Sequence, residues 1–442
     1  MSEVSVLRLY GKTYDATRWA ASHPGGAAVI ESASSLEPSV AERLFESSHE
    51  DPEKNLRRLE AYVVSDSPRC CTKTPVGVAQ VADEFYDAAR SDVRAYLAKA
   101  HPENPRGQGS VYARLKCVGF AAIWLLLVVG ACEAKSTAGV LTRASGAGIM
   151  LVSWGFVQFH DASHFAFSGG PAVNRTLTGL WCAVAYWSPW MWHKHHVEWH
   201  HACTGDYSQD PDMRHGAPFM RKTEAAPSDR YLGLSVASQM AAMFVFPGMY
   251  AGQTFHYAVV RLGLKKGLWK MNDLTPRDHG RIAAWEFALS AWLPLWVSAL
   301  ATRHGSLAVA AFGAYVLGAN FAYAANILPD HDTRASHVNR QELLCRDATI
   351  ARSWAANQVA ASANWGGRAL CFLFGGINYQ IEHHLFPRVH HTFYPEIAPV
   401  VAQTCAKFGV PYVHYPSFAA AARAVCDQIA HANADVLNPH RH

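Results

Sequence analysis

The chain has 442 residues, about half of them apolar, and a formal net charge of +4. That charge is small, and no basic segment interleaves with aromatic residues, so nothing indicates a nucleic-acid-binding surface. The ten cysteines include no CxxC pair, which argues against a cysteine zinc site or a disulfide framework. With charged residues at only 17%, the composition favours a chain that lies partly in a membrane.

Residues 1–66 have the pattern of a small soluble domain. The stretch from Leu7 to Tyr14 alternates as strands do around a Gly-Lys turn, and helical patterns follow. A tight turn is expected in His23-Pro-Gly-Gly26, and His49 follows in a second helical stretch. The first thirty residues lack the pattern of a secretory signal, so we expect the N-terminus to stay in the cytosol.

A polar linker is expected at residues 67–77, and an amphipathic helix with its connection at residues 78–110. Apolar stretches of membrane-spanning length then lie near residues 115–132, 140–159, 282–301 and 307–328. Residues 232–255 could form a fifth span. An odd number of crossings between the histidine clusters would separate them across the bilayer, so we expect residues 232–255 to be interfacial or re-entrant.

Three histidine clusters lie at the edges of these apolar stretches: His160-Asp-Ala-Ser-His164, His196-Val-Glu-Trp-His200-His201 and Gln380-Ile-Glu-His383-His384. On a helix, residues four apart share a face, so each cluster can direct imidazoles to one place. Neutral imidazole binds iron well, and seven histidines with one amide oxygen are too many ligands for one ion. The pattern therefore predicts a dinuclear iron centre. One such pair alone is usually accidental, whereas three clusters together are not.

The N-terminal region resembles the cytochrome b5 haem-binding domain. The resemblance rests on His23-Pro-Gly-Gly26 and on the flanking Tyr14-Asp-Ala-Thr-Arg-Trp19, while residues 34–39 depart from the family's acidic run. It implies an α+β domain in which His23 and His49 are the axial ligands of haem b.

The b5-like head and the three clusters together resemble the membrane fatty acyl desaturases of the b5-fused front-end group, and the resemblance runs from about Val111 to Phe418. The most specific stretch runs from Asn364 to Pro387, where Gln380 replaces a histidine. The resemblance implies a mostly α-helical fold, with a four-helix transmembrane domain and a cytosolic helical cap holding the diiron site within residues 111–425, before a C-terminal tail at 426–442.

The metal ligands that the resemblance implies are His160, His164, His196, His200, His201, Gln380, His383 and His384. Several relatives also have a histidine directly after the residue that corresponds to Asn326, where this chain has Ile327. We therefore nominate His331 as a ninth ligand. His193, one helical turn before His196, remains an alternative in the second cluster, and Asp161, Glu198 and Glu382 could orient the imidazoles.

The implied activity is an O2-dependent introduction of a cis double bond into a polyunsaturated long-chain acyl substrate, bound to coenzyme A or to a phospholipid. Electrons would come from NADH through cytochrome b5 reductase and the haem, in the endoplasmic reticulum membrane, with the haem domain and the clusters facing the cytosol. The three-residue gap between His196 and His200 favours delta-4 or delta-5 enzymes over delta-6 or delta-8 enzymes.

Three alternatives remain open on sequence grounds. A sphingolipid long-chain-base desaturase shares the b5-like head and the glutamine. A lipid hydroxylase would use the same diiron site to insert oxygen. A membrane haem electron carrier would need no second metal and would not be an enzyme.

Overall fold

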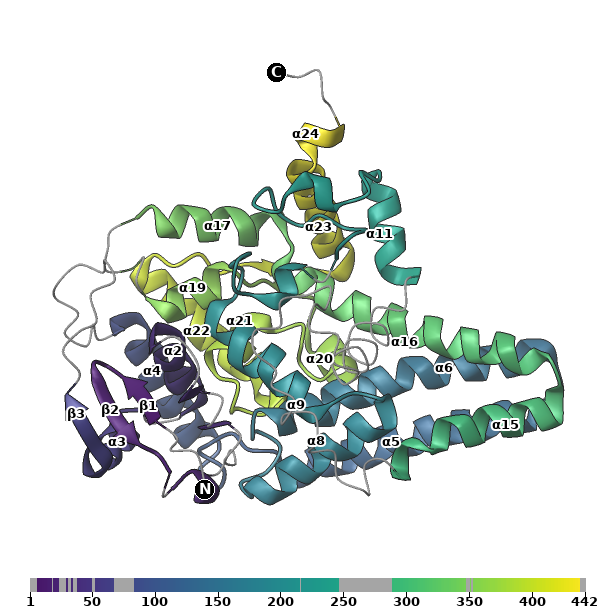
Figure 1. Ribbon diagram of the computed structural model, residues 1–442, viewed down its shortest axis with the longest axis horizontal. Coiled ribbons are helices and arrows are strands. Elements are labelled where there is room, and N and C mark those ends of the chain that lie inside the picture. The colour runs from purple at the N-terminus through teal and green to yellow at the C-terminus, as the bar shows by residue number, and fades with distance from the viewer. Residues whose placement is uncertain are drawn as a thin grey trace.

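The computed structural model describes residues 6–17, 19–23, 29–30, 33–34, 38–49, 52–66, 83–214, 216–245, 288–346, 350 and 353–437. The protein is mostly helical, as expected. Figure 1 shows a small sheet near the N-terminus, a long arm of helices, and a group of shorter helices around the inner end of the arm, which we call the cap. The predicted Pro-Gly-Gly turn after His23 and the predicted linker at 67–77 lie outside the described residues.

The N-terminal unit is built on an antiparallel sheet of β1 (Val6–Leu9), β2 (Lys12–Asp15) and β3 (Val63–Asp66), in that order. The expected turn joins β1 to β2, with Gly11 in the left-handed conformation. Helices α2 (Pro38–Ser48) and α3 (Pro52–Leu59) complete the unit. Alternation along β1 buries Leu7 and Leu9 against Phe45 of α2, so the unit has its own core.

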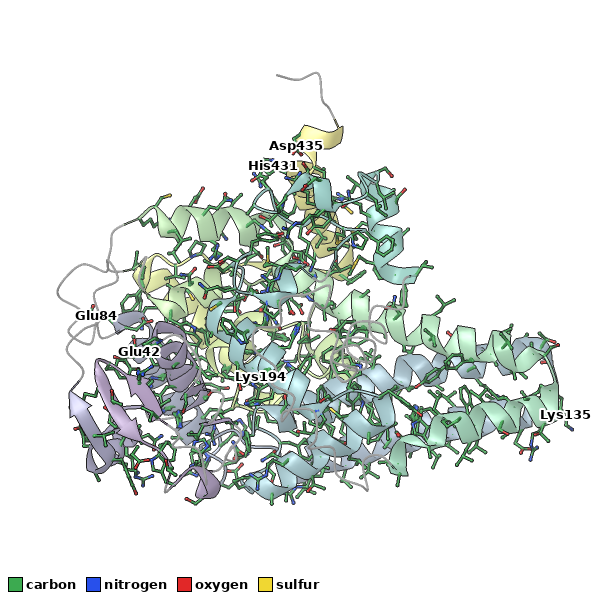
Figure 2. The ribbon with its side chains drawn as sticks, in the orientation of Figure 1. Glu42, Glu84, Lys135, Lys194, His431 and Asp435 are labelled. Carbon is green, nitrogen blue, oxygen red and sulfur yellow. The ribbon has the colours of Figure 1, made fainter. Side chains whose placement is uncertain are left out.

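Among the described residues, the arm contains α5 (Val111–Glu133), α6 (Thr137–Trp154), α15 (Trp292–His304) and α16 (Leu307–His331). The hydroxyls of Ser110 and Ser136 accept hydrogen bonds from backbone N–H groups in the first turns of α5 and α6, and so cap them. Lys135, in the turn between these two helices, marks the tip of the arm in Figure 2. Leucines and valines along α5 are exposed, which is the surface that lipid requires.

Within the described residues, three helical stretches are long and apolar enough to cross a membrane: Val111–Glu133, Thr137–Ser163 and Leu307–Leu344. They contain the expected spans at 115–132, 140–159 and 307–328. Residues 282–287 of the remaining expected span lie outside the described part, and α15 has 13 residues. The fourth span therefore stays a prediction.

The stretch expected to be interfacial contains α11 (Val236–Val245), which packs on α16 and on α23. Residues 246–255 of that stretch are outside the described part.

The cap surrounds the inner ends of α6 and α16 with short helices and a two-stranded parallel sheet, β4 (Asn364–Trp365) with β5 (His414–Tyr415). The amphipathic helix expected within residues 78–110 is α4, which packs against α22. Helix α23 runs across the boundary expected at residue 425. The main cap helices are α4 (Glu84–Ala100), α8 (Pro171–Ala185), α9 (Pro189–Trp192), α17 (Arg334–Leu344), α19 (Trp354–Ala360), α20 (Arg368–Phe374), α21 (Gln380–Leu385), α22 (Tyr394–Phe408), α23 (Phe418–Ala432) and α24 (Ala434–Leu437).

Two segments that carry the first and second histidine clusters are π-helical rather than α-helical. They are η3 (Gly155–His160), which continues into α7 (Asp161–Ser163), and η4 (His193–His200), which continues into α10 (His201–Cys203). A π-helix joins residues five apart by its backbone hydrogen bonds, so it turns side chains away from the α-helical register. The α-helical spacing assumed from the sequence therefore does not hold throughout these clusters.

Close contact between α6 and α16 depends on two glycines. A Cβ atom at Gly148 would lie 2.0 Å from the Tyr315 carbonyl oxygen, and one at Gly318 would lie 2.3 Å from the Ser145 carbonyl oxygen. Those distances are far below van der Waals contact, so only glycine permits this approach. The packing of these helices sets the position of His160, just beyond α6, relative to His331 at the end of α16.

We predict that Gly318→Ala lowers the thermal unfolding midpoint of the purified protein in detergent, because overpacking at such a contact costs about 1 to 3 kcal/mol. Gly313→Ala in the same helix is the control, since a Cβ there meets nothing within 4 Å. Alanine is normally the better helix former by about 1 kcal/mol. Equal destabilisation by both substitutions would contradict this account of the helix contact.

Candidate metal centre

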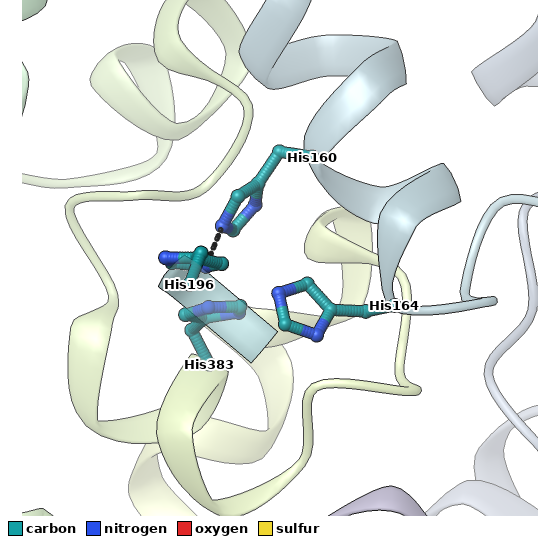
Figure 3. A group of neighbouring side chains, drawn as sticks. All are labelled: His160, His164, His196 and His383. Carbon is teal, nitrogen blue, oxygen red and sulfur yellow. Dashed lines mark hydrogen bonds between the residues drawn. The ribbon is translucent and has the colours of Figure 1, made fainter. Parts of the chain in front are cut away.

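The first group of converging imidazoles contains His160, His164, His196 and His383. Each offers one nitrogen, and these nitrogens all lie within 4.8 Å of one another. The Nε2 atoms of His160 and His196 are 3.1 Å apart. Figure 3 shows the four rings directed at one volume, with His383 brought in from α21 opposite the helix of His160 and His164. The group therefore combines all three predicted clusters.

The second group contains His200, His331 and His384, whose nitrogens also lie within 4.8 Å of one another. His331 comes from the end of α16 and His384 from α21, and their Nε2 atoms are 3.1 Å apart. The Gln380 amide nitrogen lies 2.9 Å from His331 Nε2 and 3.1 Å from His384 Nε2. His331, nominated from its place after Asn326, is thus brought together with two of the cluster histidines.

His201 lies between the two groups. Its Nε2 atom is 3.0 Å from His383 Nε2 and 3.3 Å from His196 Nε2 in the first group. Its ring also stacks on that of His384 in the second group, with centroids 4.3 Å apart. All the predicted ligands are therefore in one buried assembly that is divided into two adjoining groups.

The division does not follow the clusters. His160 and His164, four residues apart, join the same group, as the helical spacing predicts. His196 and His200 are also four apart, but they lie in the π-helical η4 and join different groups. In α21, Gln380 lies beside His384 while His383 points to the first group.

Hydrogen bonds fix the tautomers of the second group. His331 Nδ1 lies 2.9 Å from the Ala361 carbonyl oxygen, and His384 Nδ1 lies 2.6 Å from Gln358 Oε1. Gln358 presents oxygen here because its amide nitrogen donates to the His201 carbonyl. Both Nδ1 atoms therefore carry the hydrogen, and each neutral ring presents a lone pair at Nε2.

Two such lone pairs 3.1 Å apart repel each other unless a cation or a hydrogen-bond donor lies between them, and here the Gln380 amide nitrogen lies close to both. The donor set thus fits a bound metal ion. Gln380 fits as well, because its Oε1 atom is buried without a hydrogen-bond partner among the described residues. Turning the amide by half a rotation would exchange this oxygen with the nitrogen and present it to the same two lone pairs.

Burial keeps most of these imidazoles neutral. It lowers the pKa of His196, His201, His383 and His384 well below the usual value, and neighbouring histidines lower it further. Neutral rings are the form that binds a metal.

His200 differs from the other rings. Burial alone would lower its pKa, but the carboxylates of Asp212 and Asp210 raise it to about 9. His200 Nδ1 donates to Asp210 Oδ1 over 3.0 Å. Carboxylates that stabilise a proton on this ring also stabilise a metal cation bound to its other nitrogen.

The residues that orient these rings are mostly not those proposed from the sequence. Asp161 binds His391 and His390, and Glu382 accepts hydrogen bonds from Asn364 and Tyr412. The orienting groups are instead Asp210, Gln358, the Ala361 carbonyl, and the Tyr394 hydroxyl, which lies 3.3 Å from His383 Nδ1. Only Asp210 had a sequence signal, as part of the Asp-Pro-Asp that follows the second cluster.

Asp161, His390 and His391 form a further group with the spacing of metal ligands. Lys116 Nζ, however, lies 2.8 Å from His391 Nε2. A lysine ammonium so close makes a second cation unfavourable there, so we read this group as a hydrogen-bonded charge network.

His23 and His49 face each other in the N-terminal unit, with ring centroids 6.0 Å apart. This separation leaves room for one metal ion held by a nitrogen of each ring, through bonds of about 2 Å. His49 Nδ1 lies 2.7 Å from the Phe45 carbonyl oxygen and so carries the hydrogen. The lone pair of this ring is therefore on Nε2, which is the atom that can bind a metal. Burial lowers the pKa of both rings, that of His23 to about 4, so both are neutral.

A cavity of about 450 Å³ surrounds this pair and continues to the metal centre. Leu7, Trp19, Ile30 and Phe45 give it an apolar wall in the N-terminal unit, as a flat aromatic cofactor would need. Its other wall includes His164 and His201. It also includes His193, which the sequence offered as an alternative ligand in the second cluster. His193 therefore faces this cavity and belongs to neither group of converging nitrogens.

Comparison with known proteins matches residues 137–416 to the sequence model of the family described as "Fatty acid desaturase". The chain is 30% identical over 420 residues to the chloroplastic acyl-lipid (7-3)-desaturase of Chlamydomonas reinhardtii, covering 92% of this chain and 76% of the relative. It is 25% identical over 431 residues to the acyl-lipid (8-3)-desaturase of Physcomitrium patens, covering 95% of this chain and 86% of the relative. It is 26% identical over 425 residues to the Delta(5) fatty acid desaturase A of Dictyostelium discoideum, covering 92% of this chain and 86% of the relative.

We predict that His331→Ala lowers the non-haem metal content of the purified protein by about half, because it removes a donor from the second group and leaves the first intact. Metal analysis by mass spectrometry measures this. The exposed His431 is the control, and His431→Ala should keep the wild-type content. A His331→Ala protein with unchanged metal content would show that His331 is not a ligand.

Proposed function

Because the chain belongs to the fatty acid desaturase family, we propose that it introduces a cis double bond into a polyunsaturated long-chain acyl substrate, between an existing double bond and the carboxyl end. Membership of this family makes the protein an oxidoreductase that acts on a fatty acyl substrate and O2, and it excludes the alternative of a haem electron carrier without an activity of its own. Two hydrogens leave adjacent methylenes and, with two electrons and two protons, reduce O2 to two waters.

The observation that carries the proposal is the joining of three histidine clusters into two adjoining groups of buried imidazole nitrogens. We assign His160, His164, His196 and His383 to one iron, and His200, His331, His384 and Gln380 to the other, with His201 between them. Iron at these positions would supply the O2 activation that unactivated C–H bonds require. The chain itself holds the rings in place through Gln358, Asp210 and the Ala361 carbonyl, and excludes water by burial.

The electron supply is the second part of the proposal. The separation of His23 and His49 and the apolar cavity around them fit a haem b held by both rings, as in a cytochrome b5 domain. NADH–cytochrome b5 reductase would reduce this haem, in the endoplasmic reticulum membrane with both sites facing the cytosol. Fusing the carrier to the enzyme gives it an effective concentration that a separate carrier would not have.

The substrate position remains a proposal from two observations. The three-residue gap between His196 and His200 favours a delta-4 or delta-5 enzyme, and one relative is named a Delta(5) fatty acid desaturase. Two relatives are named acyl-lipid desaturases, which favours a lipid-bound acyl chain over coenzyme A. None of the three relatives compared above is named a sphingolipid desaturase or a hydroxylase.

We predict that yeast expressing the chain and fed defined polyunsaturated acids accumulates products with one new cis double bond, placed on the carboxyl side of the existing ones. Mass spectrometry of derivatised lipids locates the bond. A hydroxylated product, or a new bond in the sphingoid base alone, would contradict the proposed reaction.

We also predict that two histidine substitutions separate the two sites. His383→Ala removes a proposed iron ligand and should abolish the product while leaving the haem absorbance of the purified protein unchanged. His23→Ala should remove that absorbance. The exposed His414 is the control for both, and full activity of His383→Ala would refute the assigned centre.

A further inference from the structure

We propose that the haem pocket is shared between the two domains, and that Arg388 of the desaturase domain forms its charged wall and holds the haem domain on the metal centre. This inference rests on the proposed function, because it takes haem to be the group held by His23 and His49. It adds a binding residue from outside the cytochrome b5-like unit.

The cavity is lined by residues of both domains. It is lined on one side by His23 and His49 and on the other by Arg388 and Pro387, in the loop directly after α21. A group that fills the cavity would therefore touch both domains. The loop that carries Arg388 follows the third cluster by only a few residues, so the same segment serves the iron site and the haem pocket.

The two domains are also in direct contact. Helix α2, which ends next to His49, packs against η4 and α10, the helices of the second histidine cluster. Arg388 Nη1 donates to the Ser48 carbonyl oxygen over 3.3 Å. Ser48 is the last residue of α2, and a cation at the C-terminal end of a helix is favoured by the helix dipole. Arg388 thus binds the end of the helix that presents His49.

Arg388 is also held in place on the cavity wall. Gln108 Nε2 donates to its carbonyl oxygen over 3.1 Å, and the neighbouring His390 N–H donates to the Gly107 carbonyl over 2.7 Å. Arg388 lines the same cavity as His23 and His49, so its charge is held at the wall of the space that the two rings line.

Haem chemistry supplies the complement to this charge. Haem b carries two carboxylate side chains, and a guanidinium is the side chain best suited to bind carboxylates through paired hydrogen bonds. Ferric haem also has one more positive charge than ferrous haem. A nearby cation disfavours the ferric form and raises the reduction potential, so loss of Arg388 should lower it.

The test is to measure the haem midpoint potential of the purified full-length protein by spectroelectrochemistry. Arg388→Gln should shift the midpoint potential to a lower value. Arg388→Lys, which keeps the charge, should have a potential close to that of the wild type. Arg106→Gln is the control, because Arg106 is an exposed arginine that does not line the cavity, and it should leave the potential unchanged. The haem absorbance of each variant shows that the N-terminal unit is folded and loaded.

The outcomes separate this inference from the function on which it rests. Wild-type protein that binds no haem would overturn the haem part of the proposed function and this inference together. Protein that binds haem with the same potential in Arg388→Gln as in wild type would overturn this inference alone. An unchanged potential with a raised KM for the acyl substrate would do the same, and would make Arg388 a substrate-binding residue instead.

Discussion

The rest of the structure depends on imidazole nitrogens that converge where water is excluded. Burial keeps most of these rings neutral, and neutral lone pairs about 3 Å apart repel each other unless a cation or a hydrogen-bond donor lies between them. His331 and His384 show this most clearly, because acceptors on their Nδ1 atoms leave both Nε2 atoms without hydrogen. Bound metal would therefore stabilise the folded chain as well as serve the reaction.

The helices assemble these nitrogens from distant parts of the chain. Gly148 and Gly318 allow α6 and α16 to pack closely, which sets the separation of the segments that end in His160 and His331. The π-helical turn in η4 then sends His196 and His200 to different groups. The same helix receives α2 of the N-terminal unit, so one element lies between the two proposed redox sites.

Local patterns in the sequence predicted the apolar arm, the strands around Gly11 and the histidines that meet, because these depend on neighbours a few residues apart. His331 was nominated only through the resemblance, because several relatives have a histidine close to the residue that corresponds to Asn326. The division of ligands into two groups was not predictable, since it depends on π-helical turns that have no clear sequence signal. Gln358, Tyr394 and Arg388 were missed because their roles arise from contacts across long separations in sequence.

The central claim is that two irons lie side by side in this buried assembly. Mössbauer spectroscopy of the purified full-length protein, grown on isotopically enriched iron, tests it most directly. The account predicts two non-haem iron environments in equal amounts for each haem. A spectrum with haem iron alone, or with a single non-haem iron per chain, would contradict it.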